Sequence, residues 1–132
     1  FFTSLYAQTN NPLKSGTLNT LTLSNGEVIY NLTGEWAVSV EHYGEWAYRG
    51  IFPDIMQIEQ TDTLFSAITQ LDSTRNPKGT EKVKGELEKN GFKKVQIITG
   101  IGILDSSGKI SQNGTKILID YDKKLRLTMI KR

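Results

Sequence analysis

The residues that could take part in chemistry gather in one segment, from Glu41 to Asp54, with the sequence EHYGEWAYRGIFPD. It holds the only histidine of the chain, one of its two tryptophans, two tyrosines, a phenylalanine, an arginine and three carboxylates. Small-molecule sites commonly combine aromatic walls with a few placed polar groups, and long connecting segments are often functional. The segment therefore indicates either a structural cover over one end of a fold or the rim of a ligand site, and both interpretations stay open here.

Metal binding is a more specific alternative to these two interpretations, and it would involve Glu41, His42 and Glu45. A single histidine beside carboxylates can join a zinc or calcium shell, but zinc sites usually need several histidine or cysteine ligands. The chain has one histidine and no cysteine. We therefore expect no metal site and no cofactor.

Catalysis has little support in the sequence. A Ser-His-Asp arrangement would depend on His42 with a carboxylate, and the nucleophile-elbow motif does not occur. Paired carboxylates such as Asp120 and Asp122 are more often solvated loop ends than an acid and base pair. The Gly100–Gly102 segment has no helical pattern after it, so it indicates a strand bent or bulged at a barrel corner rather than a dinucleotide loop. We expect no enzymatic activity and no catalytic residue.

Length and composition limit the remaining classes. A chain of 132 residues fits one domain with a real core, and 37% hydrophobic residues with twelve glycines is typical of a β-rich globular protein. The 16 basic and 14 acidic residues leave a net charge of +2, which argues against a nucleic-acid partner. No apolar run approaches the roughly 20 residues that span a bilayer as a helix, so we expect no membrane span.

The beginning of the chain indicates export. Residues 1–7 (FFTSLYA) resemble the tail of an apolar signal peptide ending at a small residue, which predicts a periplasmic or secreted protein. A short aromatic strand is the alternative. We assign 8–26 to a flexible N-terminal arm that is rich in turn formers. Within it, residues 17–23 either form a hairpin with 27–30 through Ser24-Asn25-Gly26, placed before the barrel, or run as an extended stretch.

The domain that follows, residues 27–132, has the pattern of short strands. Trp36, Val38 and Val40 alternate with Ala37, Ser39 and Glu41, which is the period of a half-buried strand. Strands are predicted at 35–42, 54–60, 63–70, 80–88, 92–98, 109–111, 115–120 and 124–131. The predicted turns include Asn90-Gly91, Ser106-Ser107-Gly108 and Asn113-Gly114.

Strands joined by such short turns must be antiparallel neighbours. We therefore predict an all-β fold, a single antiparallel up-and-down meander barrel of about eight strands, and prefer it to a sandwich because closure removes exposed edges. A helix at 80–90 is the competing interpretation of the charged residues there. Val83, Gly85 and Leu87 alternate with charged residues, and Gly85 would cost a helix interior about 1 kcal/mol, which favours a strand.

A family resemblance accompanies this pattern. The segment Leu32-Thr33-Gly34-Glu35-Trp36 resembles the Gly-x-Trp opening of the first barrel strand in lipocalins and their calycin relatives. The resemblance implies that Trp36 closes one end of a lipocalin-like barrel. It also implies that a basic residue of the last strand, Arg126, Lys131 or Arg132, packs across the indole, and Gly34, Trp36 and Arg126 are our structural candidates.

Together these observations predict a small exported binding protein for a small hydrophobic ligand. The alternative is a non-catalytic structural or interaction protein of the envelope or secretome, such as an inhibitor, with a protein partner. The predicted ligand site is the barrel mouth under residues 42–54. Its predicted members are Trp46, Tyr48 and Phe52 as the apolar wall, with His42 and Arg49 as polar selectors that weakly favour an anionic head group.

Overall fold

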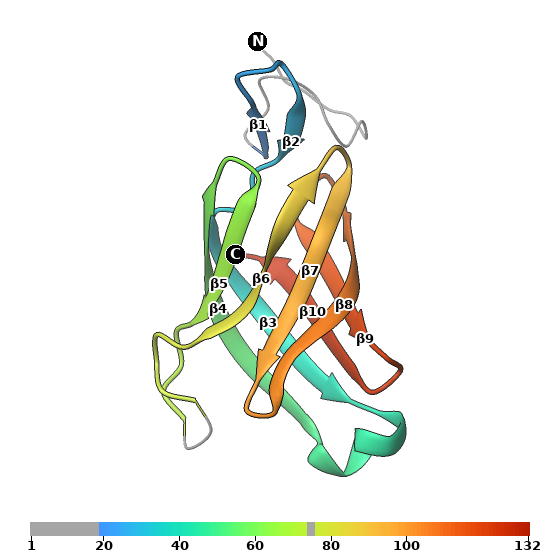
Figure 1. The fold of residues 1–132 in the computed structure, drawn as a ribbon. Helices are drawn as coiled ribbons and strands as arrows, with labels where there is room; N and C mark the ends of the chain where they lie inside the picture. Colours follow the sequence, from blue (N-terminus) through green and yellow to red (C-terminus); the bar gives the residue numbers. More distant parts are fainter. Residues whose placement is uncertain (1–18, 74–75) are drawn as a thin grey trace.

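The protein is a closed antiparallel β-barrel with a small hairpin at one end (Figure 1). The computed structural model describes residues 19–73 and 76–132. The hairpin consists of β1 (Thr20–Thr22) and β2 (Val28–Tyr30). The barrel strands are β3 (Gly34–His42), β4 (Ile51–Thr61), β5 (Leu64–Thr69), β6 (Glu81–Glu88), β7 (Gly91–Thr99), β8 (Gly102–Ser111), β9 (Lys116–Tyr121) and β10 (Leu125–Lys131), and a 3-10 helix, η1 (Gly44–Arg49), joins β3 to β4.

The strand order is that of a meander in which each strand pairs with its neighbours along the chain, and β10 closes the barrel on β3. All eight pairings are antiparallel. The predicted all-β up-and-down barrel of eight strands is confirmed. Residues 81–88 form β6, so the helical alternative for this segment is wrong.

The hairpin alternative at the start of the chain is the one that the structure contains. Thr20 pairs with Tyr30 across the β1–β2 turn, and Ile29, Tyr30 and Leu32 are buried against the barrel. The barrel itself begins at Gly34, so residues 19–33 belong to the hairpin and its connection. The predicted signal tail at 1–7 and residues 8–18 of the predicted arm lie outside the described residues.

Two strand boundaries differ from the prediction by more than one residue. Strand β8 begins at Gly102 instead of residue 109, and the predicted turn at Ser106–Gly108 lies inside it, so that turn is wrong. The β7–β8 turn is at Gly100-Ile101 instead, between Thr99 and Gly102, which pair with each other. Every second residue of β8 from Ile103 to Ser111 is exposed, so Ser107 faces solvent, whereas Ser106 and Gly108 lie on the half-buried face.

Strand β4 begins at Ile51, three residues before the prediction, and includes Pro53, which pairs with Ser39 of β3. Proline cannot donate to a β-ladder. It is accommodated because the β4–β5 ladder begins only at Met56, so this part of β4 has a strand neighbour on one side. The connection expected over residues 42–54 is therefore reduced to η1 and its flanking residues.

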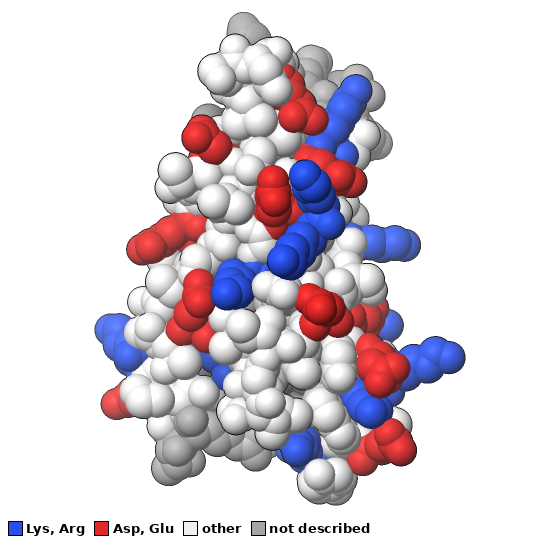
Figure 2. All heavy atoms as spheres, viewed as in Figure 1, with Lys and Arg blue, Asp and Glu red and all other residues white. Residues whose placement is uncertain are grey.

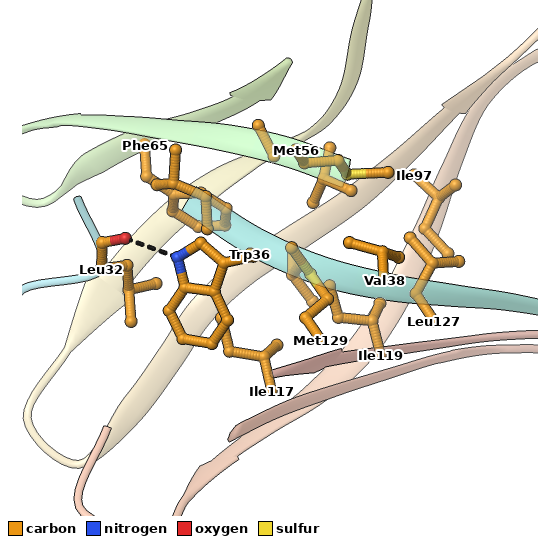
Figure 3. Close-up of a cluster of buried hydrophobic side chains, with 14 of the residues drawn as sticks. Leu32, Trp36, Val38, Met56, Phe65, Ile97, Ile117, Ile119, Leu127 and Met129 are labelled. Carbon is orange, nitrogen blue, oxygen red and sulfur yellow. Dashed lines mark hydrogen bonds between the residues drawn. The ribbon is translucent and has the colours of Figure 1, made fainter. Parts of the chain in front are cut away.

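The core fills the half of the barrel nearest the hairpin. Trp36 is completely buried there, and its indole Nε1–H donates to the carbonyl oxygen of Leu32 at 2.8 Å (Figure 3). Side chains from strands far apart in the sequence surround it, and the fully buried ones include Met56, Ile58, Ile117, Ile119 and Met129. The predicted burial of Trp36 at a barrel end is confirmed.

Lys131 provides the basic group over the Trp36 ring, with its Nζ 5.7 Å from the ring centroid. The ammonium donates to the carbonyl oxygen of Thr33 at 2.9 Å, and burial lowers the pKa of Lys131. Gly34 has a φ of +134°, and a Cβ at this position would lie 3.4 Å from Lys131 Cε. A side chain here would strain the backbone and crowd the lysine that covers the indole.

Arg126 does not take part in this contact. Its Nε donates to Asp120 Oδ1 at 2.7 Å, and its guanidinium lies 5.9 Å from the ring of Tyr43, which follows β3 at the other end of that strand. Of the basic residues that the resemblance offered, Lys131 is therefore the one on Trp36. The structural role predicted for Arg126, that of the basic residue packed on Trp36, is therefore wrong, and Lys131 of β10 has this role.

Charged side chains of both signs are mixed over the face shown in Figure 2, without one continuous patch of a single sign. This agrees with the small net charge of +2. In the part of the chain that the structure describes, no helix has the length and apolar character to cross a membrane.

Gln60 connects the hairpin segment to the barrel, and its loss is expected to lower the free energy of unfolding. Its Oε1 accepts from Leu32 N at 2.8 Å, and its Nε2 donates to Tyr30 O at 2.9 Å and to Asp62 O at 3.1 Å. Gln60→Ala would remove these partners and should cost about 1–2 kcal/mol, measured by urea unfolding. Gln57→Ala, on an outward position of β4, is the matched control, and an equal loss in both variants would contradict the linking role of Gln60.

Candidate functional site

The barrel is hollow at the end opposite the hairpin, where a cavity of about 490 Å³ opens. This volume is in the range of small-molecule sites, roughly 300–1,000 Å³. The opening lies among η1, the β5–β6 connection and the β7–β8 turn, which meet at the lower end of the barrel in Figure 1. The apolar wall comes from four strands, β3, β4, β7 and β10, and includes Val40, Phe52, Met56, Ile97, Leu125 and Leu127.

Asp54 places a carboxylate inside this apolar wall. It pairs with Val38, which is buried, so both side chains face the barrel interior. Its Oδ1 accepts from Thr69 Oγ1 at 2.6 Å and from the Ile55 backbone N–H at 2.7 Å. These bonds fix the orientation of the carboxylate at the cavity wall.

Lys82 brings an ammonium to the same cavity because β6 is irregular at this position. Ala67 pairs with Val83 but Ile68 pairs with Glu81, so Lys82 is an extra residue opposite β5. A regular strand would direct Lys82 away from the face that Val83 occupies. A bulge of this kind re-aims a side chain, and here it puts Lys82 into the cavity lining.

The Lys82 ammonium donates a hydrogen bond from its Nζ to Asn76 Oδ1 at 3.2 Å, and both residues line the cavity. Burial lowers the pKa of Lys82, and the charge of Asp54 opposes this effect. Among the described residues, no ion pair within 4.0 Å joins Lys82 to a carboxylate. Lys82 and Asp54 therefore act on each other through space across the cavity.

His42 and Arg49 stand at the mouth. His42 Nδ1 lies 2.8 Å from the Gly50 carbonyl oxygen, and because a carbonyl oxygen only accepts, Nδ1 is the donor in this contact. The ring contacts Phe52 edge-on, with centroids 6.1 Å apart. Arg49 also lines the mouth, and its guanidinium stacks on Trp46 at 4.8 Å from the ring centroid.

Trp46 and Tyr48, which the sequence predicts in the apolar wall, do not line the cavity. Trp46 packs against Tyr121 at a centroid distance of 5.6 Å, with Lys124 Nζ 5.5 Å from its ring. Tyr48 is 79% exposed. Trp46 fastens η1 to the end of β9 and the following turn, so its role in the structure is to hold the loop.

The structure thus brings three of the predicted site residues to the cavity, namely His42, Arg49 and Phe52. Three further polar residues line the cavity without having been predicted from the sequence, namely Asp54, Thr69 and Lys82. Alternation with Phe52 and Met56 could have placed Asp54 on the inner face. No sequence signal places Lys82 there, because its orientation depends on a register shift between β5 and β6.

The residues considered for a metal do not converge. Glu41 and His42 are adjacent on β3 and so point to opposite faces, and Glu45 pairs with Lys124 at 3.3 Å. Across residues 19–73 and 76–132, no group of three or more histidine, cysteine, aspartate or glutamate side chains could hold a metal ion.

The two ends of the barrel thus differ. Trp36 is buried at the filled end, and Asp54 and Lys82 line the cavity at the hollow end. Comparison of this chain with protein-family models, with curated proteins and with solved structures finds no match.

Proposed function

We propose that this protein binds a small, largely hydrophobic ligand in the cavity at the hollow end of the barrel. The observation that carries the proposal is the cavity itself, about 490 Å³ with an apolar wall and a few placed polar groups. An eight-stranded barrel either fills its interior with side chains or leaves room for one small ligand. This barrel is filled with side chains at the hairpin end and contains the cavity at the mouth.

A lipocalin-like character belongs to the same proposal. Gly34, Trp36 and Lys131 support it, because they form the contact that the Gly-x-Trp resemblance implies, at the filled end of a closed barrel of eight strands. Export to the periplasm or the exterior, expected from residues 1–7, is also part of the proposal.

We further propose that the protein is not an enzyme. His42 Nδ1 is directed at the Gly50 carbonyl, so no carboxylate orients this ring as in a catalytic triad. The carboxylate beside it in sequence, Glu41, lies on the opposite face of β3.

A second candidate function, an interaction protein, is favoured by the rim of the mouth. Five large apolar side chains around it are exposed, namely Tyr48, Ile51, Leu71, Ile101 and Ile103. Exposed apolar residues that gather in one region often mark a contact surface. Such a surface is compatible with ligand binding, since a lipophilic ligand must pass the same rim.

The test is to fill the cavity with a side chain. Val40→Trp replaces a half-buried residue of the wall, and Ser39→Trp adds the same group to the exposed face of the same strand. Calorimetric titration with decanoic acid and with anilinonaphthalene sulfonate should give saturable binding to the parent. Binding should fall about tenfold or more in Val40→Trp because the wall space is lost, and it should persist in Ser39→Trp.

Melting curves establish that both variants are folded. Unchanged affinity in a folded Val40→Trp protein would remove the cavity as the site. If the parent binds neither probe, the interaction function becomes the better explanation of the exposed rim.

A further inference from the structure

We propose that the ligand is a lipophilic acid that carries a hydrogen-bond donor next to its carboxylate, such as an aliphatic 2-hydroxy acid. This inference depends on the proposed binding function and specifies the polar end of the ligand. Lys82 receives the carboxylate and Asp54 receives the donor. The apolar part of the ligand lies along the wall formed by residues such as Val40, Ile97 and Leu127.

The acidic part of the ligand follows from the charges of the lining. Lys82 and Arg49 are cationic and Asp54 is the single anionic side chain among the described lining residues, which gives the lining a formal charge of +1. The Lys82 ammonium has three donors, and in the described structure one of them is used, by Asn76 Oδ1. The other donors can bind an anion that enters the cavity, and burial strengthens that attraction relative to water.

The hydrogen-bond donor proposed for the ligand follows from the hydrogen bonding of the Asp54 carboxylate. Its Oδ1 already accepts two hydrogen bonds, whereas its Oδ2 accepts none from the described residues. A ligand that covers Oδ2 without donating to it would leave a carboxylate oxygen desolvated beside a second negative charge, which is costly. A hydroxyl or amide N–H next to the ligand carboxylate satisfies this oxygen.

The geometry of the strands allows one head group to reach both side chains. Asp54 is on β4 and Lys82 is on β6, and Thr69 of β5 lies between these strands. Lys82 and Asp54 interact electrostatically without forming an ion pair within 4.0 Å. A head group with an acceptor on one side and a donor on the other fits between them.

A ligand series with a constant chain tests this inference in the parent protein. The series consists of decanoic acid, 2-hydroxydecanoic acid, methyl decanoate and decylamine, each measured by calorimetric titration. We expect 2-hydroxydecanoic acid to bind about tenfold more tightly than decanoic acid, because one hydrogen bond to a charged group is gained. The ester should bind more weakly than decanoic acid, and the amine most weakly because Lys82 and Arg49 repel it.

Two variants assign the preference to its residues. Lys82→Met should bring decanoic acid and its methyl ester to within about twofold of each other, since the anion loses its partner. Asp54→Leu should abolish the preference for the hydroxyl group and should strengthen the binding of decanoic acid, since the like charge is gone. Lys82→Arg retains the charge and is expected to keep the preference for the acid.

The outcomes separate the two proposals. Equal binding of all members of the series by the parent would overturn the head-group inference and leave the binding function intact, whereas no binding of any member would remove the binding function. A preference for the hydroxy acid that persists in Asp54→Leu would also overturn the inference. If a variant fails to fold, the series in the parent still decides, because the order of affinities is predicted for the unmodified chain.

Discussion

Replacement of Trp36 by alanine is expected to lower the free energy of unfolding by about 3–5 kcal/mol, the range for loss of a large buried aromatic side chain. Trp36 is completely buried, and its ring contacts residues from several strands. The substitution also leaves the Leu32 carbonyl without its indole donor at 2.8 Å. Urea unfolding followed by circular dichroism at constant protein concentration measures the change.

Two further substitutions test whether the loss of unfolding free energy in Trp36→Ala comes from the burial of its indole ring. Trp46→Ala removes the second tryptophan, which is half-buried on η1 against Tyr121, and we expect a smaller loss of about 1 kcal/mol because part of its ring is in solvent. Lys131→Met removes the cation above Trp36 and should cost about 0.5–2 kcal/mol. If Trp36→Ala unfolds at the same urea concentration as the parent, Trp36 does not organise the core.

The order of strands could be predicted because most turns in this chain have local signals. Alternation in β3 and the Asn90 and Asn113 turns gave the antiparallel neighbours, and both asparagines have positive φ in the structure. A meander needs only such local information, since each strand pairs with the next. The exception is closure of β10 on β3, which we inferred from the cost of exposed edges.

The candidate site was only partly predictable, because the sequence does not specify which side chains of a loop point toward the barrel axis and which point away from it. The segment 42–54 is aromatic, but sequence does not show whether a ring points into the mouth or over its outer edge. Trp46 takes the outer position because Tyr121 offers a ring there. Lys82 was missed for another reason, since the bulge that turns it inward is a relation between β5 and β6 and has no local signature.

The interior also contains two glycines beneath a pair of aromatic rings, and this arrangement leads to the second large prediction. Phe65 and Phe92 lie with ring centroids 5.4 Å apart. A Cβ on Gly85 would be 2.9 Å from Phe65 Cε1, and a Cβ on Gly108 would be 2.8 Å from Phe92 Cδ2. Each ring thus occupies the space that a side chain on its glycine would need, so both glycines are required by packing.

Gly85→Ala should be the more damaging of the two substitutions, with a loss of about 3 kcal/mol or more in the free energy of unfolding, at the upper end for overpacked cores. The new Cβ would lie 2.2 Å from the Lys94 carbonyl oxygen and 3.0 Å from Val95 Cα. Both atoms belong to the backbone of β7, so relief requires the β6–β7 pairing to move. At Gly108 the closest atoms belong to the Phe92 ring, which can shift, and we expect Gly108→Ala to cost less.

Gly91→Ala is the matched control for this series, since no atom lies within 4 Å of its Cβ position. With that space open, the substitution should leave stability unchanged or raise it by about 0.5 kcal/mol, because alanine restricts the unfolded chain. Urea unfolding of the three variants should therefore rank Gly85→Ala below Gly108→Ala and Gly91→Ala at or above the parent. A Gly85→Ala protein as stable as the Gly91→Ala protein would mean that β6 and β7 can separate at Lys94 without loss, and the close packing of these strands would not be a source of stability.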